Sequence, residues 1–191
     1  MVKIKICGIQ TLADVEKVNQ VQPELVGFVF APSKRQIDAT TAQKLRQHLN
    51  PEIISVGVYV KQSSDIIKAA LEQQIISQVQ YYGKLPDGLA TMIHQLHGQL
   101  IQVITDKNHI DAAADYVMFD DSQGRGLAPK TFSPHHLSKP EYLSGGINVK
   151  NVKTAVTMVK PVVVDVSSST ETNGQKDLAK MQALTNLVHE L

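Results

Sequence analysis

The sequence has one cysteine, no tryptophan and a formal net charge of only +1 at pH 7. A lone cysteine cannot form an internal disulfide, and without a second cysteine or a histidine cluster nearby it does not make a zinc site. The balanced charge gives no broad field for nucleic acid or an anionic membrane, so any anion must be held locally. No leader-like segment or apolar run long enough for a membrane helix occurs. We therefore expect a soluble cytoplasmic protein.

Short apolar runs alternate along the chain with stretches of helical spacing. The runs predict eight strands, at 3–7, 25–30, 54–60, 75–80, 100–104, 115–119, 141–144 and 162–166. The stretches between them predict helices at about 11–20, 39–48, 63–73, 86–97, 108–113, 133–137, 148–158 and 177–189. Nearly continuous apolar strands are typical of a parallel sheet that is covered on both faces.

The spacing of these units favours an α/β fold of one closed (β/α)₈ TIM barrel. Eight units in 191 residues leave about 24 residues each, enough for a strand, a helix and two short loops. We therefore predict a single barrel domain over residues 1–191. An open doubly wound sheet is the alternative, because periodicity alone does not exclude it.

Two acid–base candidates follow predicted strands. In a barrel, functional residues gather at the C-terminal ends of the strands, where Cys7 and Asp120 stand. A strand cysteine is more often buried filler. A thiol facing a carboxylic acid across the ring is, however, the minimum needed to take a proton from carbon and deliver another to oxygen. Cys7 and Asp120 are therefore the candidate catalytic residues, with Asp121 as the alternative acid.

An anion site is predicted after the seventh and eighth strands. Gly145 and Gly146 sit in the segment SGGIN, where unhindered backbone N–H groups can point at an oxygen-rich ligand. Ser167, Ser168 and Ser169 follow the last strand. Barrel phosphate sites are commonly built from these two loops, so the pair predicts a phosphate site.

Arg35 is the candidate cation at the mouth of the barrel. It ends the segment FAPSKR after the second strand, where a guanidinium can hold a phosphate with two hydrogen bonds. The histidines fall on predicted helices or loops away from the strand ends. They are expected to be solvated or capping groups, and no metal site is predicted.

Several motifs together resemble those of the phosphoribosylanthranilate isomerase family. They are KIKICGI, VGFVFAPSKRQI, LSGGINVKNV and VDVSSSTETNGQKD, and the similarity extends over essentially the full length. The resemblance implies a (β/α)₈ enzyme of tryptophan biosynthesis that catalyses an Amadori rearrangement without a metal or cofactor. The substrate is an anthranilate-substituted ribose 5-phosphate, and a monomer or homodimer is expected.

The resemblance also implies roles for individual residues. Cys7 corresponds to the general base that removes the proton from C2′, and Asp120 to the general acid that protonates the furanose oxygen. Arg35 corresponds to an arginine that meets the anthranilate carboxylate or neighbouring anionic groups, and Asp165 to an aspartate near the sugar. The implied phosphate-binding residues are Gly145, Gly146, Ser167 and Ser168.

Departures from the family pattern leave two alternatives open. Tyr82 stands where the family usually has a histidine, and Ser169 stands where it usually has a glycine. If position 169 requires a positive φ, the serine would strain the loop by about 1 to 3 kcal/mol. The first alternative is a barrel that binds a sugar phosphate without turnover. The second is an isomerase of a related amino sugar phosphate, with a pocket reshaped by Tyr81 and Tyr82.

Overall fold

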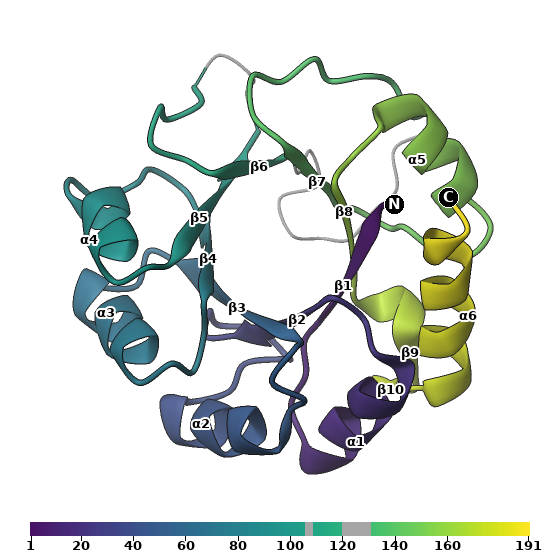
Figure 1. Ribbon diagram of the computed structural model, residues 1–191, viewed down its shortest axis with the longest axis horizontal. Helices are drawn as coiled ribbons and strands as arrows, with labels where there is room; N and C mark the ends of the chain where they lie inside the picture. Colours follow the sequence, from purple (N-terminus) through teal and green to yellow (C-terminus); the bar gives the residue numbers. More distant parts are fainter. Residues whose placement is uncertain (106–108, 120–130) are drawn as a thin grey trace.

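Eight parallel strands close into a barrel in chain order (Figure 1). The computed structural model describes residues 1–105, 109–119 and 131–191. The barrel strands are β1 Lys3–Cys7, β2 Leu25–Val29, β3 Ile54–Val60, β4 Gln78–Tyr82, β5 Gln99–Ile104, β6 Tyr116–Phe119, β7 Glu141–Leu143 and β8 Val163–Val166. Pairing of β1 with β8 closes the ring. The closed (β/α)₈ prediction is confirmed, and the open sheet is excluded.

The helices lie around the outside of the ring (Figure 1). They are α1 Leu12–Val21, α2 Ala39–His48, α3 Ser64–Glu72, α4 Leu89–Gln95, α5 Val152–Val159 and α6 Leu178–His189. After β8 come the 3-10 turn η1 Ser168–Thr170 and a hairpin of β9 Glu171–Thr172 and β10 Gln175–Lys176. None of the described helices is long and apolar enough to cross a membrane.

Two predicted helices are wrong. The described part of 108–113 and all of 133–137 form turns and extended loop instead, and Figure 1 shows loop rather than helix outside β6 and β7. The first segment is too short to recover the cost of helix nucleation without strong tertiary packing. The second contains Pro134 and ends before Pro140, and proline disfavours helix in the residue before it.

Three elements begin three or more residues later than predicted, namely β4, α4 and α5, and other boundaries differ by no more than two residues. α4 begins at Leu89 and not at 86. β4 begins at Gln78, because Ile75 and Ile76 are buried in the connection from α3. α5 begins at Val152 and not at 148. The side chain of Asn148 accepts a hydrogen bond from the Lys150 N–H at 2.9 Å, which stabilises a turn before the helix.

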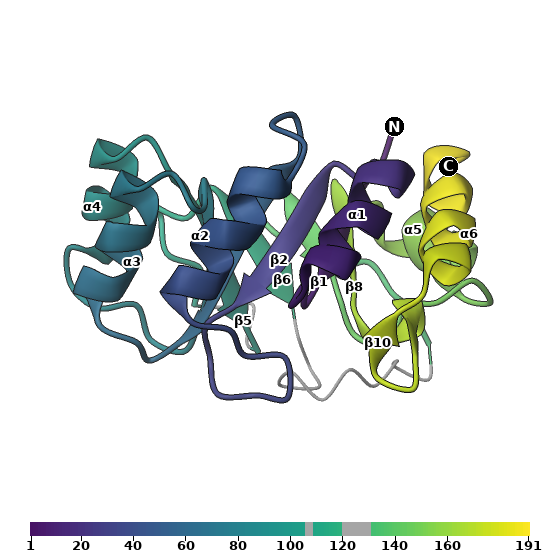
Figure 2. The same ribbon diagram turned by 90° about the horizontal axis from the view of Figure 1, so that it is seen from below.

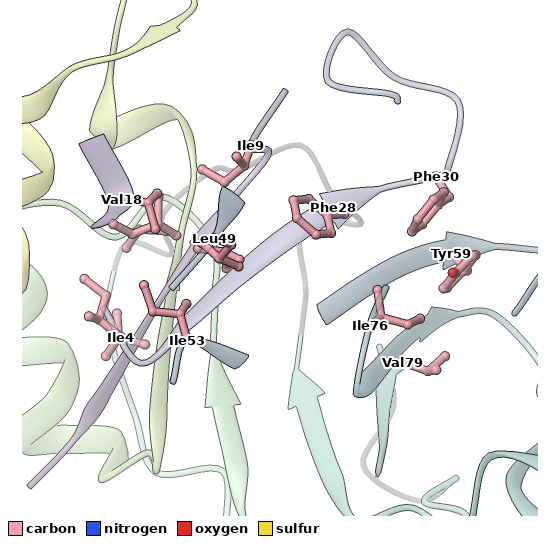
Figure 3. Close-up of a cluster of buried hydrophobic side chains, with 14 of the residues drawn as sticks. Ile4, Ile9, Val18, Phe28, Phe30, Leu49, Ile53, Tyr59, Ile76 and Val79 are labelled. Carbon is pink, nitrogen blue, oxygen red and sulfur yellow. The ribbon is translucent and has the colours of Figure 1, made fainter. Parts of the chain in front are cut away.

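The larger apolar core lies between the strands and the helices. Figure 3 shows part of this cluster, in which Phe30 and Tyr59 stack with their ring centroids 4.9 Å apart. A second apolar cluster lines the inside of the ring, with Leu25, Val56, Ile101 and Tyr142 among its members. Successive strand residues therefore alternate between the two cores, as the pleat requires.

The loops at one end of the barrel come from distant parts of the chain. Figure 2 shows the loop after β2 and the β9–β10 hairpin projecting from the same end, opposite the two chain termini. This end holds the C-terminal ends of the parallel strands. Loops there are free to carry ligand-binding residues while the strands hold them in place.

Candidate active site

A cavity of about 320 Å³ opens at the C-terminal end of the barrel. Residues from both ends of the chain line it, and they include every predicted site residue that the structure describes: Cys7, Arg35, Gly145, Gly146, Asp165, Ser167 and Ser168. The volume suits a small ligand. The predicted acid Asp120 and its alternative Asp121 lie outside the described residues.

Cys7 is the last residue of β1, and it borders this cavity. The residue is partly exposed rather than sealed in the packed interior. Its neighbour across the sheet is Gly27. A β-carbon at Gly27 would lie 2.6 Å from the sulfur, which is too close for any real contact. The glycine therefore makes the space that the Cys7 side chain occupies.

A buried lysine lies beneath Cys7 on the same face of β1. The Lys5 ammonium donates to Gln80 Oε1 at 2.8 Å and to both carboxylate oxygens of Asp165 at 3.1 Å. Burial alone would lower the pKa of Lys5, but the charges of Asp165 and Cys7 and the hydrogen bonds to them together outweigh burial, and the pKa is raised. Lys5 therefore stays charged inside the barrel, and Asp165 is held in place below the cavity.

The thiol of Cys7 lies among charges of both signs. Burial raises the pKa of Cys7 above its ordinary value, and Asp165 adds to the rise. The charges of Lys5 and Lys176 oppose it, and Lys5 also interacts with the thiol through a hydrogen bond. A thiolate is the basic form of cysteine. Lys5 and Lys176 are therefore the groups that stabilise the Cys7 thiolate.

Arg35 lies on the other side of Cys7, in the loop after β2. Its guanidinium binds the carboxylate of Glu171 through Nε and Nη2, at 2.7 and 2.9 Å. The side chain is one-fifth exposed and borders the cavity. Arg35 was predicted at the mouth of the barrel, and the structure confirms this position. Two nitrogens of its guanidinium, Nε and Nη2, are already bound to the Glu171 carboxylate.

The segment after β7 forms a tight turn beside the cavity. Gly145 and Gly146 adopt φ values of +94° and +63°, which L-residues with side chains rarely adopt. The side-chain amides of Asn148 and Asn151 both donate to the Gly146 carbonyl oxygen at 3.0 Å. That carbonyl is held by the protein, so the turn has a fixed orientation.

Serine side chains around the cavity fall into two groups. The Ser167 hydroxyl donates to the Cys7 carbonyl oxygen at 3.0 Å and ties β8 to β1. The hydroxyl oxygens of Ser144 and Ser169 are buried against the cavity without a partner among the described residues. Buried polar atoms are normally satisfied, so each of these two hydroxyls lacks a partner that such an atom usually has.

Position 169 carries no backbone strain. Ser169 does not adopt a positive φ, because it lies within the 3-10 turn η1. The conditional expectation of strain is therefore not met. The serine adds a hydroxyl donor where the family usually has none.

Tyr81 and Tyr82 lie on opposite sides of the barrel wall. Tyr82 points inward and borders the cavity. Tyr81 is buried in the outer core between strands and helices and does not border the cavity. Of the two tyrosines considered for reshaping the pocket, only Tyr82 is placed to do so.

The described histidines do not form part of this cavity. His135 is nevertheless close to a strand end, because its ring lies 4.6 Å from that of Phe119, the last residue of β6. It also forms a short contact with Glu141. No cluster of three or more potential metal ligands occurs in the part of the chain that the structure describes.

Many (β/α)₈ barrels bind phosphate with the loops after strands seven and eight, and in this chain both of these loops line the cavity. A family model described as N-(5′-phosphoribosyl)anthranilate (PRA) isomerase matches residues 4–186. The chain belongs to this family.

Individual relatives are similar over the whole chain. An N-(5′-phosphoribosyl)anthranilate isomerase of Lacticaseibacillus casei (strain BL23) is 38% identical, with 100% of this chain and 98% of the relative covered. The crystal structure of phosphoribosyl anthranilate isomerase from Thermotoga maritima is 27% identical with a TM-score of 0.83, and both chains are fully covered. The family resemblance predicted from the motifs is confirmed.

Two further structures bear on ligand and assembly. One phosphoribosyl anthranilate isomerase, 28% identical with a TM-score of 0.78 and full coverage of both chains, is in complex with reduced 1-(o-carboxyphenylamino)-1-deoxyribulose 5-phosphate. Another, from Thermotoga maritima, is described as monomers generated from a dimeric enzyme; it is 27% identical with a TM-score of 0.78 and full coverage of both chains. Relatives of this chain thus bind a phosphorylated analogue and occur as monomers or dimers.

Proposed function

We propose that this chain catalyses the Amadori rearrangement of N-(5-phosphoribosyl)anthranilate to 1-(2-carboxyphenylamino)-1-deoxyribulose 5-phosphate, a step in tryptophan biosynthesis. Family membership supports the reaction. The observation that carries the proposal for this site is the place of the Cys7 sulfur. It borders a cavity that is also lined by the Gly145–Gly146 turn and by Ser144 and Ser169, whose hydroxyls have no partner among the described residues.

The reaction needs one acid, one base and no electron acceptor. In the proposed sequence, Asp120 protonates the furanose oxygen while the bond from that oxygen to C1′ breaks, which leaves a protonated imine. The Cys7 thiolate then removes the proton from C2′ to give an enolamine. A proton then returns to C1′ while the C2′ hydroxyl gives up its proton, which restores the acid and leaves the aminoketose, so substrate and product are isomers. Each proton transfer contributes roughly 10²- to 10⁴-fold to the rate.

The remaining cavity residues would bind and orient the substrate. We propose that Gly145, Gly146, Ser167 and Ser168 hold the phosphate, joined by Ser169; all five residues line the cavity. We propose that Asp165, which forms an ion pair with Lys5, contacts the sugar. We assign Arg35 to an anionic group of the substrate, either the anthranilate carboxylate or its neighbours. Fixing the substrate at both ends brings C2′ to the base, which is a major source of rate enhancement.

A direct test follows the decay of substrate fluorescence with the wild type and the variants Cys7→Ser, Asp120→Asn and Asp121→Asn. We expect Cys7→Ser and Asp120→Asn to lose at least about 100-fold in kcat, with nearly unchanged ligand affinity. Asp121→Asn is the matched control for the neighbouring carboxylate. A Cys7→Ser enzyme with full activity would contradict the base assignment, and loss only in Asp121→Asn would move the acid by one residue.

A binding module without turnover is the second candidate, favoured by the altered positions Tyr82 and Ser169. It predicts a wild type that binds inorganic phosphate but does not consume the substrate. A related isomerase would consume a different amino sugar phosphate instead. We further propose that residues 1–191 act as one domain, as a monomer or homodimer in the cytoplasm, without a nucleic-acid partner. Sedimentation of the purified chain tests the assembly.

A further inference from the structure

A cluster of buried charges joins the loop after β2 to the hairpin after β8, and these two strands both pair with β1. Arg35 belongs to the loop after β2, and Glu171 is the first residue of β9, 136 positions later. Two parallel hydrogen bonds join them, from Nε and Nη2 of the guanidinium to the two carboxylate oxygens. This two-bond geometry fixes the plane of the guanidinium as well as its distance from the carboxylate.

Lys176 of β10 completes the cluster. Its ammonium donates to Glu171 Oε1 at 3.1 Å, to Thr170 Oγ1 at 3.2 Å and to the Ser167 carbonyl oxygen at 3.2 Å. All three N–H groups of the ammonium therefore have acceptors. The side chains of Lys176 and Glu171 are only 2% and 6% exposed. A cluster of this kind is stable only because each buried charge is paired.

The carboxylate of Glu171 remains ionised in this setting. Burial alone would raise the pKa of Glu171, but the hydrogen bonds and charges of Arg35 and Lys176 outweigh burial and lower the pKa. Glu171 therefore presents a full negative charge to Arg35 at neutral pH. Neither Glu171 nor Lys176 borders the cavity, so their contact with a ligand is indirect.

The path of the Arg35 side chain explains why the contact with Glu171, here called the clamp, determines the orientation of the guanidinium. The side chain crosses directly over Gly8, where a β-carbon would lie 2.3 Å from Arg35 Cδ. This path brings the guanidinium close enough to the Cys7 thiol for their charges to interact. A long side chain that nothing holds would occupy many other rotamers. The Glu171 carboxylate stabilises the Arg35 rotamer that lies along the mouth of the cavity.

The clamp leaves part of the guanidinium available. Glu171 takes the N–H of Nε and one N–H of Nη2, and Nη1 has no partner among the described residues. The side chain borders the cavity. An anionic group in the cavity can therefore bind the free edge of the guanidinium while the other edge stays on Glu171.

We infer that Glu171 is a positioning residue that acts through Arg35, with Lys176 holding Glu171 in place. The inference rests on the proposed function, because it assigns the clamped arginine to an anionic group of the same substrate. Glu171 itself makes no contact with the substrate. The β9–β10 hairpin thereby sets the orientation of a binding residue that belongs to the opposite end of the sequence.

The test is a double-mutant cycle on substrate turnover. The four proteins are the wild type, Glu171→Gln, Arg35→Met and the double variant, with Glu52→Gln as a matched control. Glu52 is exposed, and its substitution removes the same charge elsewhere on the molecule. We expect Glu171→Gln to raise KM about 10-fold or more with kcat within about 3-fold, because a binding contact becomes loose. In the Arg35→Met background the same substitution should change kcat/KM less than about 2-fold.

The outcomes separate the inference from the function it rests on. A wild type without turnover contradicts the proposed function. An active wild type in which Glu171→Gln has the same effect with and without Arg35 overturns the inference alone. So does a fall in kcat at unchanged KM, because a purely structural role lowers the amount of active protein rather than the affinity of each molecule.

A second pair of variants covers the case in which Glu171→Gln does not fold. Glu171→Met combined with Lys176→Met removes both charges of the buried pair and leaves neither unpaired, which proteins often tolerate. This protein should fold and show the same rise in KM. Glu171→Asp should recover part of the affinity, because it keeps the charge at a longer distance. A folded double-methionine variant with the wild-type KM would overturn the inference.

Discussion

Gly27 and Cys7 face each other across strands β1 and β2, and a β-carbon at Gly27 would lie 2.6 Å from the Cys7 sulfur and 3.1 Å from its Cα. The thiol fills the space that a side chain on β2 would take. The rotamer of the proposed base therefore depends on the absence of a side chain on the neighbouring strand.

Gly27→Ala should displace the sulfur or push the two strands apart. We expect kcat to fall by about 100-fold, because a shift of about 1 Å in a reacting group has that effect. Gly83→Ala is not a suitable control, since Gly83 has a φ of +98°. Gly57→Ala on β3, where a β-carbon would meet Tyr59 and Ile76 rather than Cys7, serves instead. Steady-state kinetics check the pair, and an unchanged kcat for Gly27→Ala would contradict this account of the glycine.

The raised pKa of the Cys7 thiol should appear in its alkylation. The thiolate is the reactive form, so the rate with iodoacetamide should rise with pH through a midpoint above the ordinary thiol value of 9.0. Lys5 opposes the rise, so Lys5→Met should move the midpoint higher still. Lys3→Met, on the exposed start of the same strand, should leave it unchanged. A midpoint below 9.0 in the wild type would refute the burial argument.

Removal of Lys5 should also destabilise the protein. Lys5→Met leaves the carboxylate of Asp165 in the barrel without its cation, and loss of one partner from a buried pair costs about 3 to 5 kcal/mol. Lys3→Met should change the free energy of unfolding by less than about 0.5 kcal/mol. Urea denaturation measures both. Recovery of stability in Lys5→Met/Asp165→Asn would locate the effect in the pair, whereas no recovery would place it elsewhere.

The contribution of Glu171 to the free energy of unfolding should depend on pH. Its pKa is lowered in the folded protein below the ordinary value of 4.5, so its contribution to stability is complete above that value and is lost as the pH falls through the folded pKa. The difference in unfolding free energy between the wild type and Glu171→Gln should therefore be constant near neutral pH and shrink in acid. A difference that grows on acidification would have the wrong sign.

Tyr82 should affect the binding of the aromatic substrate but not of phosphate alone. Loss of an aromatic contact corresponds to a rise in KM of about 2- to 10-fold, so Tyr82→Ala should show that rise. Inhibition by inorganic phosphate should stay the same. Tyr81→Phe is the control, because Tyr81 lies in the outer core. Equal effects of Tyr82→Ala on both ligands would place the tyrosine at the phosphate instead.

The sequence predicted the barrel and most of the mouth because both follow from local patterns. Apolar runs located the strands, and the rule that strand ends carry function located Cys7 and Arg35. The segment 133–137 has a polar, helix-like spacing, but it contains Pro134 and is followed by Pro140, and it forms loop. Tertiary packing, which decides such short segments, does not appear in a local pattern.

The charged interior could not be predicted in the same way. Lys5 occupies a position where charged residues are rare, and its partner Asp165 comes 160 residues later. The same holds for Arg35 and Glu171. Pairs so far apart become visible only when the ring closes. Lys5 lies in the motif KIKIC and Asp165 in the motif VDVSS. These motifs resemble those of the family, but they do not show that the two side chains form an ion pair.

The partial exposure of Cys7 has a practical consequence, since it is the sole cysteine of the chain. A thiol-reactive fluorophore would label one atom per molecule, at the edge of the cavity, without removal of any other cysteine. Its emission would report occupancy of the pocket in real time, and its stoichiometry would count competent sites in a preparation.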